Sequence, residues 1–258
     1  MFPSTDGSGR EARDAVRRAS VVLDVIPASY AAQRVPGKPL AVLWGKPMLQ
    51  LVWERARAAP GIDALVIATD DERIANAARE WGAAVEMTSG DCASGTDRVA
   101  EVARRHPEAG ILLNIQGDEP ELDAEAVGRL VATLRAEPTV AMGTLAHAER
   151  DEAAMAAPDV VKVGVDAGGF ALYFTRRWPA PDPRGAVLRH VGVYAFTRDF
   201  LLEFASWPPG AMEREERLEQ LRAVERGVRI RVVTGTRPFA GVDTPEQLAA
   251  LERRGPRP

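Results

Sequence analysis

Several residue types are scarce in this sequence, and each shortage excludes a class of protein. Among 258 residues there is one cysteine, Cys92, so no intramolecular disulfide can form, and a reducing, cytoplasmic compartment is expected. No uninterrupted apolar run approaches the ~20 residues that cross a bilayer, and residues 1–18 lack the apolar segment of a secretory signal. We therefore expect no membrane partner, and we interpret Cys92 as structural rather than as a reactive thiol.

Lysine is almost as scarce as cysteine. Positive charge comes mainly from arginine, and lysine occurs only at positions 38, 46 and 162. The formal net charge of −4 argues against a protein that coats nucleic acid, because such binding needs an excess of positive charge. No nucleic-acid partner is expected. A weakly acidic protein can still hold a triphosphate where a few cations and backbone N–H groups converge.

Apolar and charged residues are both plentiful, at 46% and 27%, which indicates a soluble chain with a substantial core. The first half alternates buried strands with amphipathic helices. Strands are predicted at 21–27, 65–69, 84–87 and 111–116, and helices at 47–58, 70–81, 97–105 and 123–136. This alternation predicts an α/β fold of three layers, α/β/α, with a Rossmann-like, mostly parallel mixed sheet. Ligands of such sheets bind beyond the carboxyl ends of the strands.

The second half changes character. A β-hairpin is predicted from strands at 160–166 and 170–176, followed by a strand at 191–196, a helix at 213–226, a strand at 228–234 and a helix at 244–254. Thr244 and the proline after it form a typical helix start. The chain has no internal repeat and no low-complexity linker. We expect residues 1–20 to be a poorly ordered extension and residues 21–258 to be one domain, with an inserted β-rich subdomain at about 158–197.

The loop after the first strand carries the strongest chemical signal. Arg34 and Lys38 lie four residues apart around a Pro-Gly turn, so both cations could neutralise the charge of a leaving pyrophosphate, and Gly37 would allow close backbone approach. The alternative is a surface loop with two solvated cations. The loop matches neither the phosphate-binding pattern G-x-x-x-x-G-K-[ST] nor the dinucleotide pattern G-x-G-x-x-G.

Two carboxylates are candidate metal ligands. Asp118 comes just past the end of a predicted strand, where it could hold Mg²⁺ together with substrate phosphates, and Gly117 removes side-chain bulk where a nucleotide must approach. Asp243 precedes the last helix. The alternatives are that Asp118 caps a turn and that Asp243 belongs to the helix start.

These segments belong to a longer series of motifs. Pro27 to Leu40 reads P-A-x-Y-A-x-x-R-x-P-G-K-P-L, and G-K-P-M follows at 45–48. Further blocks are Ala68-Thr-Asp70, Ser94-Gly-Thr-Asp-Arg98, Asn114-Ile-Gln-Gly-Asp-Glu-Pro120, Ala171-Leu-Tyr-Phe-Thr-Arg176, Leu188-Arg-His-Val-Gly-Val-Tyr194, Leu218-Glu-Gln-Leu-Arg222 and Gly241-Val-Asp-Thr-Pro-Glu246. In this order, from about 21 to 252, the sequence resembles the nucleotidyltransferases that make CMP-3-deoxy-manno-octulosonate (CMP-KDO synthetases).

The resemblance implies a CTP-dependent cytidylyltransferase that transfers CMP to the sugar acid 3-deoxy-manno-octulosonate (KDO) and releases pyrophosphate. It implies Mg²⁺ as cofactor and a homodimer formed through the hairpin region. The implied catalytic residues are Lys38, Arg34 and Asp118, and the implied metal ligands are Asp118 and Asp243. The implied nucleotide-binding residues are Pro27, Ala28, Ser29, Lys38, Ser94, Gly95, Arg98 and Gln116. The implied acceptor-binding residues are Gln116, Arg176, His190, Tyr194, Glu219 and Gln220.

Some of these residues have plainer interpretations. Without the resemblance, Ser94 could be only a helix N-cap, and His190 would more often be a strand-end histidine than a ligand. The aromatic residues Trp178, Phe200, Phe204 and Trp207 indicate core or dimer contacts rather than a binding surface.

The sequence departs from the family pattern in three places. Ser29 stands where relatives carry a phosphate-binding arginine, Ser89 stands at a second position that is commonly basic, and the connection at 178–187 is short. These departures leave alternatives open. One is a divergent cytidylyltransferase for another small acid, such as the phosphonate phosphonoformate, and another is a catalytically weak nucleotide-binding relative. A glycosyltransferase is a further alternative, although the usual Asp-x-Asp is missing.

Overall fold

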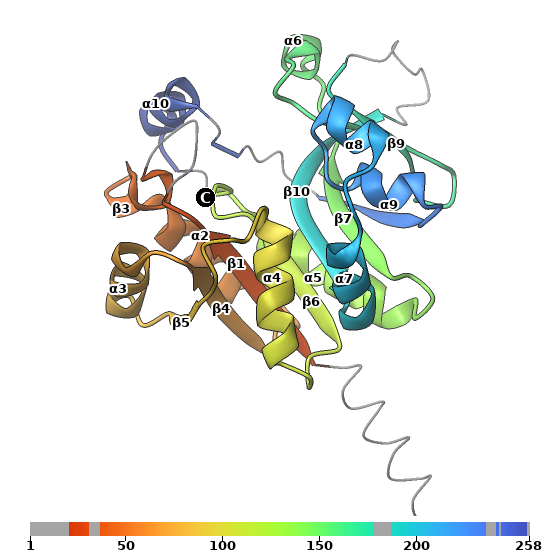
Figure 1. Cartoon of the computed structure of the whole chain (residues 1–258). Helices are drawn as coiled ribbons and strands as arrows, with labels where there is room; N and C mark the ends of the chain where they lie inside the picture. The colour runs from red at the N-terminus through yellow and green to blue at the C-terminus, as the bar shows by residue number, and fades with distance from the viewer. Residues whose placement is uncertain (1–20, 31–36, 178–186, 236–240, 243, 257–258) are drawn as a thin grey trace, which may run out of the picture.

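A computed structural model describes residues 21–30, 37–177, 187–235, 241–242 and 244–256 (Figure 1). The expectations for the N-terminal extension, Arg34, Asp243, Trp178 and most of the short 178–187 connection lie outside these residues.

One nine-stranded mixed sheet forms the centre of the protein. Its main path runs β11-β7-β10-β6-β1-β4-β5, and β8 joins β9 to the side of β10. The strands β1, β4, β5 and β6 are mutually parallel, whereas β10 is antiparallel to its partners β6, β7 and β8. The bounds are β1 Val22–Ala28, β4 Ala64–Thr69, β5 Ala84–Met87, β6 Ile111–Ile115, β7 Met142–His147, β8 Lys162–Val165, β9 Ala171–Thr175, β10 Val187–Thr197 and β11 Ile230–Thr234.

Helices cover both faces of the sheet, which confirms the predicted α/β/α layers. Apolar side chains of α2 (Met48–Arg57), α3 (Glu72–Glu80) and α5 (Ala124–Ala136) form one core with the sheet. Those of α4 (Gly95–Arg105), α7 (Arg198–Ser206) and α9 (Leu221–Glu225) form a second core on the opposite face, where α4 and α7 stand in front of the sheet in Figure 1. Smaller elements are η1 (Lys38–Leu40), β2 (Val42–Leu43), β3 (Lys46–Pro47), α6 (Glu152–Ala156), α8 (Ala211–Glu216) and α10 (Pro245–Arg254).

The single helix predicted at 213–226 is wrong. The chain breaks at Arg217, whose φ of 55° lies in the left-handed region, and it forms α8 and α9 instead. The reason is the buried guanidinium of Arg222, which binds both carboxylate oxygens of Glu213 at 2.8 and 2.6 Å. In a continuous helix, side chains nine residues apart would be separated by about 13 Å along the axis. The ion pair therefore requires the chain to fold back.

Strand β7 and helix α7 were also not predicted, nor were the short elements η1, β2, β3 and α6. Strand β7 contains glycine and threonine among its apolar residues, so its pattern is weak, yet it is buried along its whole length between β10 and β11. Helix α7 carries Phe200 and Phe204, which pack with Trp207 in the second core. The interpretation of these aromatic residues as core is confirmed for the three that the structure describes.

The parallel strands deliver polar residues to one edge of the sheet. Ser29 follows β1, Asp70 follows β4, and Gln116 follows β6. Helix α10 lies near the same edge (Figure 1) and is fixed to the β2–β3 hairpin by Trp44, whose indole N–H donates to Leu251 O at 3.1 Å. This edge is where the fold predicts a ligand.

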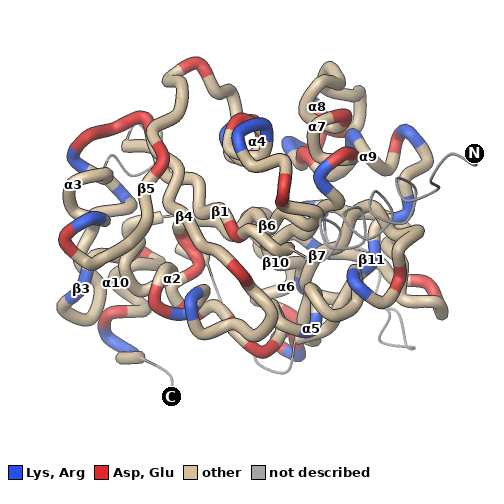
Figure 2. Tube along the Cα trace, turned by 90° about the horizontal axis from the view of Figure 1, so that it is seen from below, with Lys and Arg blue, Asp and Glu red and all other residues tan. Residues whose placement is uncertain are grey.

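Acidic and basic residues are interspersed along the described trace in the view of Figure 2. Within the described ranges, no helix has both the length and the apolar character needed to cross a membrane.

Asp24 is an unusual residue for the centre of a parallel sheet. It lies in β1 with 0% of its surface exposed, and neither carboxylate oxygen has a hydrogen-bond partner among the described residues. Burial raises the pKa of Asp24 from 3.8 to about 8, because a charge in an apolar interior is costly. At neutral pH the folded protein therefore holds a protonated carboxyl, while the unfolded chain ionises.

We predict that Asp24→Asn, which keeps the shape but cannot ionise, removes a pH-dependent loss of stability. The folded pKa lies above the unfolded one, so the stabilisation is complete below about pH 4 and is lost as pH rises toward 8. The variant should gain up to about 1.4 kcal/mol per pH unit relative to the wild type between pH 5 and 8. Urea unfolding of both proteins at four pH values measures this. Parallel stability curves would contradict it.

Candidate functional site

The first cavity lies at the carboxyl ends of β1 and β6 and is called here the β1 pocket. It encloses about 530 Å³, a size typical of small-molecule sites. Its lining comes from five sequence-distant segments: Pro27, Ala28, Ser29, Lys38, Pro39, Asp70, Gly90, Cys92, Ala93, Ser94, Gly95, Arg98, Gln116, Gly117 and Asp118. All the described residues predicted to bind the nucleotide are in this set.

Local backbone geometry fixes Lys38 in this pocket. Gly37 has a φ of 71°, which glycine adopts without strain, and its N–H donates to Tyr30 O at 3.1 Å. The turn leads into the short helix η1, whose Pro39 is buried. Lys38 Nζ then lies 2.6 Å from Asp118 Oδ2, with 12% and 31% of the two side chains exposed. This ion pair holds a cation and a carboxylate side by side at the pocket.

The amino end of α4 forms another wall of the β1 pocket. Ser94 is the N-cap: its hydroxyl accepts from Asp97 N at 3.2 Å, and Asp97 accepts from Ser94 N in return. A Cβ atom on Gly95 would lie 3.1 Å from Pro27 Cγ, so glycine allows α4 to pack closely on β1. Ser94 therefore caps the helix and also lines the pocket. An N-terminus in this position favours anions.

Arg98 supplies a second cation on this wall, but its guanidinium is already engaged. It forms an ion pair with Asp70 at 3.2 Å and donates to Thr88 Oγ1, and only 5% of its side chain is exposed. Of the described residues that line the β1 pocket, Lys38 and Arg98 are the cationic ones. Position 29, where the sequence has serine, also lines it.

Gly117 is closely surrounded by side chains of α2 and β1. A Cβ atom there would lie 3.2 Å from Leu49 Cδ1 and 3.7 Å from Ile26 Cγ2. The missing side chain therefore lets the loop pack against α2 and β1, and Gly117 also lines the β1 pocket.

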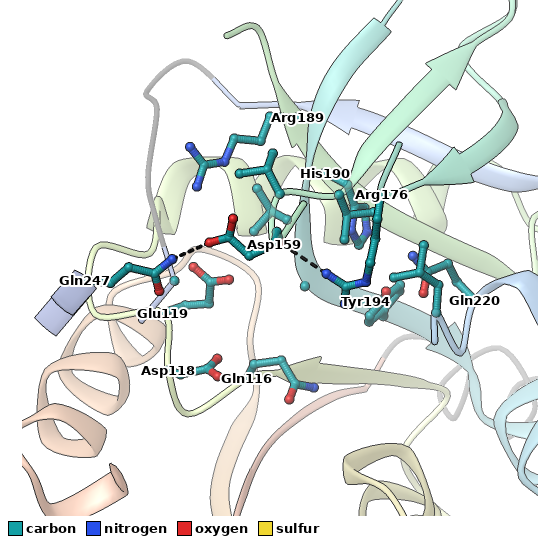
Figure 3. Close-up of a pocket in the computed structure, with 16 residues that line it drawn as sticks. Gln116, Asp118, Glu119, Asp159, Arg176, Arg189, His190, Tyr194, Gln220 and Gln247 are labelled. Carbon is teal, nitrogen blue, oxygen red and sulfur yellow. Dashed lines mark hydrogen bonds between the residues drawn. The ribbon is translucent and has the colours of Figure 1, made fainter. Parts of the chain in front are cut away.

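A second cavity, called here the β10 pocket, adjoins the first (Figure 3). It encloses about 210 Å³ between β10, the end of β9 and α10. It is lined by Gln116, Asp118, Glu119, Asp159, Val160, Val161, Arg176, Arg189, His190, Val191, Gly192, Tyr194, Leu218, Gln220, Gly241 and Gln247. Gln116 and Asp118 line both cavities, so the two pockets share a wall.

Arg176 and Asp159 dominate one side of the β10 pocket. The Arg176 guanidinium donates to two neutral backbone carbonyls, Asp159 O at 3.1 Å and Glu216 O at 3.2 Å. The Asp159 side chain accepts from Gln247 Nε2 at 2.5 Å. In Figure 3 this bond joins α10 to the loop before β8 across the cavity.

His190 is a neutral residue at the base of this pocket. Thr144 Oγ1 lies 2.9 Å from His190 Nε2 and 2.8 Å from Val193 O. The hydroxyl has one proton, and the Val193 carbonyl can only accept it, so His190 Nε2–H donates to Thr144. Burial, aided by the charge of Arg176, lowers the pKa of His190 from 6.5 to about 3. Burial likewise raises the pKa of the Tyr194 hydroxyl.

Glu219 and Gln220 are adjacent in sequence, but only Gln220 lines the β10 pocket. Both oxygens of Glu219 accept hydrogen bonds from α4, one from Ser94 Oγ at 2.9 Å and one from Thr96 Oγ1, and burial raises the pKa of the carboxyl. Glu219 is not among the residues that line the β10 pocket. Gln220 does line it, is 3% exposed, and its Nε2 has no hydrogen-bond partner among the described residues.

The structure thus brings Gln116, Arg176, His190, Tyr194 and Gln220 together in one cavity, and Glu219 next to it. Sequence reasoning missed Asp159, Arg189 and Gln247, which line the same cavity. Asp159 precedes a strand, and Gln247 completes the capping box of Thr244. Each residue is explained by this local role, so nothing in the sequence indicates that it lines a cavity. Arg189 adjoins the recognised His190, and that adjacency was the one available signal.

No group of three or more histidine, cysteine or carboxylate side chains forms a metal cage within the described ranges. The structure does give Asp118 a setting suited to a cation beside an anionic ligand. Its carboxylate lies at the wall between the two pockets, next to Lys38.

Comparisons with known proteins agree with this geometry. The family model described as cytidylyltransferase matches residues 24–230. A 3-deoxy-manno-octulosonate cytidylyltransferase of Solibacter usitatus is 49% identical over 90% of this chain and 93% of its own. Another, from an Anaeromyxobacter species, is 50% identical over 94% of this chain and 100% of its own. The structure of a CMP:2-keto-3-deoxy-manno-octonic acid synthetase complexed with CTP superposes with a TM-score of 0.84 and 41% identity, over 91% of this chain and 98% of that one.

We predict that His190 stays neutral between pH 5 and 8, because its pKa is lowered to about 3. His106 is the internal control. Burial lowers its pKa, but the carboxylates of Glu86 and Glu108 outweigh that effect and raise it. In ¹⁵N-edited NMR spectra across this range, the His106 imidazole should stay protonated to a higher pH than a free histidine, and the His190 imidazole should keep constant shifts with the proton on Nε2. A His190 that titrates near pH 6 would contradict the buried tautomer.

Proposed function

The chain belongs to the cytidylyltransferase family, and on this premise we propose that it transfers CMP from CTP to 3-deoxy-manno-octulosonate, forming CMP-KDO and pyrophosphate. Relatives with this activity in their names are about half identical to the chain and align with nearly all of it. The fold likeness extends to a structure solved with CTP.

The observation that carries the proposal is the wall shared by the two pockets. Nucleotidyl transfer needs an acceptor oxygen held close to the α-phosphorus of the nucleotide, in line with the leaving pyrophosphate. CTP in the β1 pocket and the sugar acid in the β10 pocket would meet at Gln116 and Asp118, which line both. Two adjoining cavities of about 530 and 210 Å³ suit a larger nucleotide and a smaller acid.

For the nucleotide, the supporting chemistry is that of a polyphosphate site. Pro27, Ala28 and Gln116 would contact the cytidine, together with the amino end of α4 at Ser94 and Gly95. Lys38, held by Asp118, would bind the triphosphate and stabilise charge as pyrophosphate departs. Arg34 is included as a second such cation on the strength of the sequence motif.

For the metal, we propose that Asp118 and Asp243 hold Mg²⁺, which prefers a few carboxylates plus substrate phosphates. Val242, the residue before Asp243, donates its N–H to Asp118 O at 2.9 Å, so the two segments meet. The N-cap of α10, one residue further along the chain, is Thr244. Bound Mg²⁺ would neutralise phosphate charge and orient the triphosphate.

For the acid, Arg176 suits a carboxylate, because a guanidinium binds one through two parallel hydrogen bonds. Gln220 Nε2 offers a buried donor. The neutral His190 suits a hydroxyl group better than an anion, since a charged imidazole is not available. A sugar acid, with one carboxylate and several hydroxyls, fits this mixture of groups. Tyr194 and Glu219 would complete the surroundings.

Two further features follow the family resemblance and remain proposals. One is a homodimer through the segment at about 158–197, which includes the β8–β9 hairpin. The other is a cytoplasmic location, consistent with one free cysteine in a chain of this length.

The proposal is tested by pyrophosphate release from CTP and Mg²⁺ with a panel of acids: KDO, phosphonoformate and a buffer blank. We expect turnover with KDO and a loss of at least about a hundredfold in Lys38→Met, which removes the phosphate-side cation. Turnover with phosphonoformate but not with KDO would refute KDO as the acceptor. CTP binding without turnover of any acid would refute the proposed enzymatic activity. Sugar transfer from a nucleotide-sugar without pyrophosphate would indicate a glycosyltransferase.

Ser29 supports a separate prediction. It lines the β1 pocket, where Arg98 is already bound to Asp70. Ser29→Arg should add a charge-assisted contact to the triphosphate and lower the KM for CTP roughly three- to tenfold. Ser29→Gln, of similar length but neutral, is the matched control and should leave the KM nearly unchanged. An equal effect of both substitutions would show that side-chain length, not charge, is what position 29 lacks.

A further inference from the structure

Lys162 has no place in the proposed chemistry, yet it is the most unusual cation of the described chain. It is one of only three lysines in an arginine-rich sequence, it opens β8, and 0% of its surface is exposed. A buried ammonium group costs several kcal/mol unless it is fully hydrogen bonded. The ammonium group of Lys162 must therefore be hydrogen bonded inside the protein.

Three backbone carbonyls satisfy Lys162. Its Nζ donates to Ala157 O at 2.9 Å, to Val160 O at 2.9 Å and to Arg176 O at 2.7 Å. An ammonium group has three donors that converge on one atom, so these three acceptors use it completely. Burial lowers the pKa of Lys162, but the three carbonyls all favour the protonated form. The planar fork of an arginine could not meet three oxygens gathered around one point.

These carbonyls come from two segments that contribute walls of the β10 pocket. Ala157 and Val160 flank the short loop that carries Asp159, and Arg176 directly follows β9. The Arg176 guanidinium returns to the same loop, where it donates to Asp159 O at 3.1 Å. Lys162 from inside and Arg176 from the cavity side therefore clamp one short loop between them.

We propose that Lys162 is a positioning residue for the acid substrate: it holds the Asp159 loop and the end of β9 in register, so that Arg176 presents its guanidinium to the substrate carboxylate. The inference rests on the proposed function and names how the acid side of that site is assembled. The fixed charge of Lys162, in a wall without water contact, also adds to the attraction for an anion.

A purely structural role of Lys162 would affect the KM values for the two substrates differently from a positioning role. The residues that line the β1 pocket come from 27–39, 70–98 and 116–118, and none comes from the segments that Lys162 joins. Loss of Lys162 should therefore weaken acid binding selectively if it positions Arg176. General destabilisation would alter the KM values for both substrates or lower the active fraction without changing either.

The experiment compares Lys162→Met with the wild type, using Lys46→Met as the matched control. Lys46 is an exposed lysine paired with Glu54 at 2.7 Å, away from both pockets. Pyrophosphate release is measured with each substrate varied at saturating levels of the other. We expect Lys162→Met to raise the KM for the acid about tenfold or more, with the KM for CTP within about twofold of wild type. Lys46→Met should change neither.

The double variant Lys162→Met/Arg176→Met separates positioning from independent effects. If Lys162 acts through Arg176, its loss should add little in the Arg176→Met background, and the two effects on the acid KM should be strongly non-additive. Multiplicative effects, or a Lys162→Met enzyme with the wild-type acid KM, would overturn the proposal. So would an equal rise in the KM for CTP.

A variant that fails to fold does not remove the test. Lys162→Arg keeps the charge but not the three converging donors, so it should also raise the acid KM while the CTP KM stays the same. An unchanged acid KM in that variant overturns the proposal. All measurements use whichever acid the wild type turns over. If KDO fails and another acid is turned over, the proposed acceptor is refuted. The KM comparison with that other acid then decides the role of Lys162. Failure of every acid would refute both.

Discussion

The parallel pairing of β1 with β4 on one side and β6 on the other is the constraint on which the site depends. Because parallel strands end at the same edge, Ser29, Asp70 and Gln116 converge although the sequence separates them by 87 residues from first to last. The ion pair of Lys38 with Asp118 then links the loop after β1 to the loop after β6. The β1 pocket is in this sense formed by the ends of three parallel strands.

The β10 pocket is assembled differently. It uses side chains that sit along an antiparallel strand, β10, and it closes with elements from the far end of the chain. The register of β10 against β7 shifts between Val191 and Tyr194, and Gly192 lies within this bulge and lines the cavity. Bulges of this kind re-aim side chains near functional sites. His190 and Tyr194 thus reach one pocket from the two sides of an irregularity.

Sequence reasoning identified the layers, the parallel strands and the loop of Lys38, because those depend on local patterns of period, glycine and proline. It failed where a contact between distant residues decides local structure. The fold-back at Arg217 follows from the pairing of Arg222 with Glu213, and no helical period encodes it. Asp24 was read as part of an apolar strand, and its protonated state emerges only from its surroundings. Gln247 was missed because its position in the sequence is already explained by its local role in the capping box of α10. Nothing in the sequence therefore indicated that it also lines a pocket.

The wall made by Gln116 and Asp118 has a consequence for thermodynamics as well as for geometry. Residues that line both cavities change their surroundings when either cavity fills, so the free energies of the two binding events are not independent. Such linkage is reciprocal: whatever factor the first ligand applies to the affinity of the second, the second applies to the first. If each cavity holds one substrate, as proposed, Gln116 and Asp118 would couple the two binding events directly, because they contact both cavities.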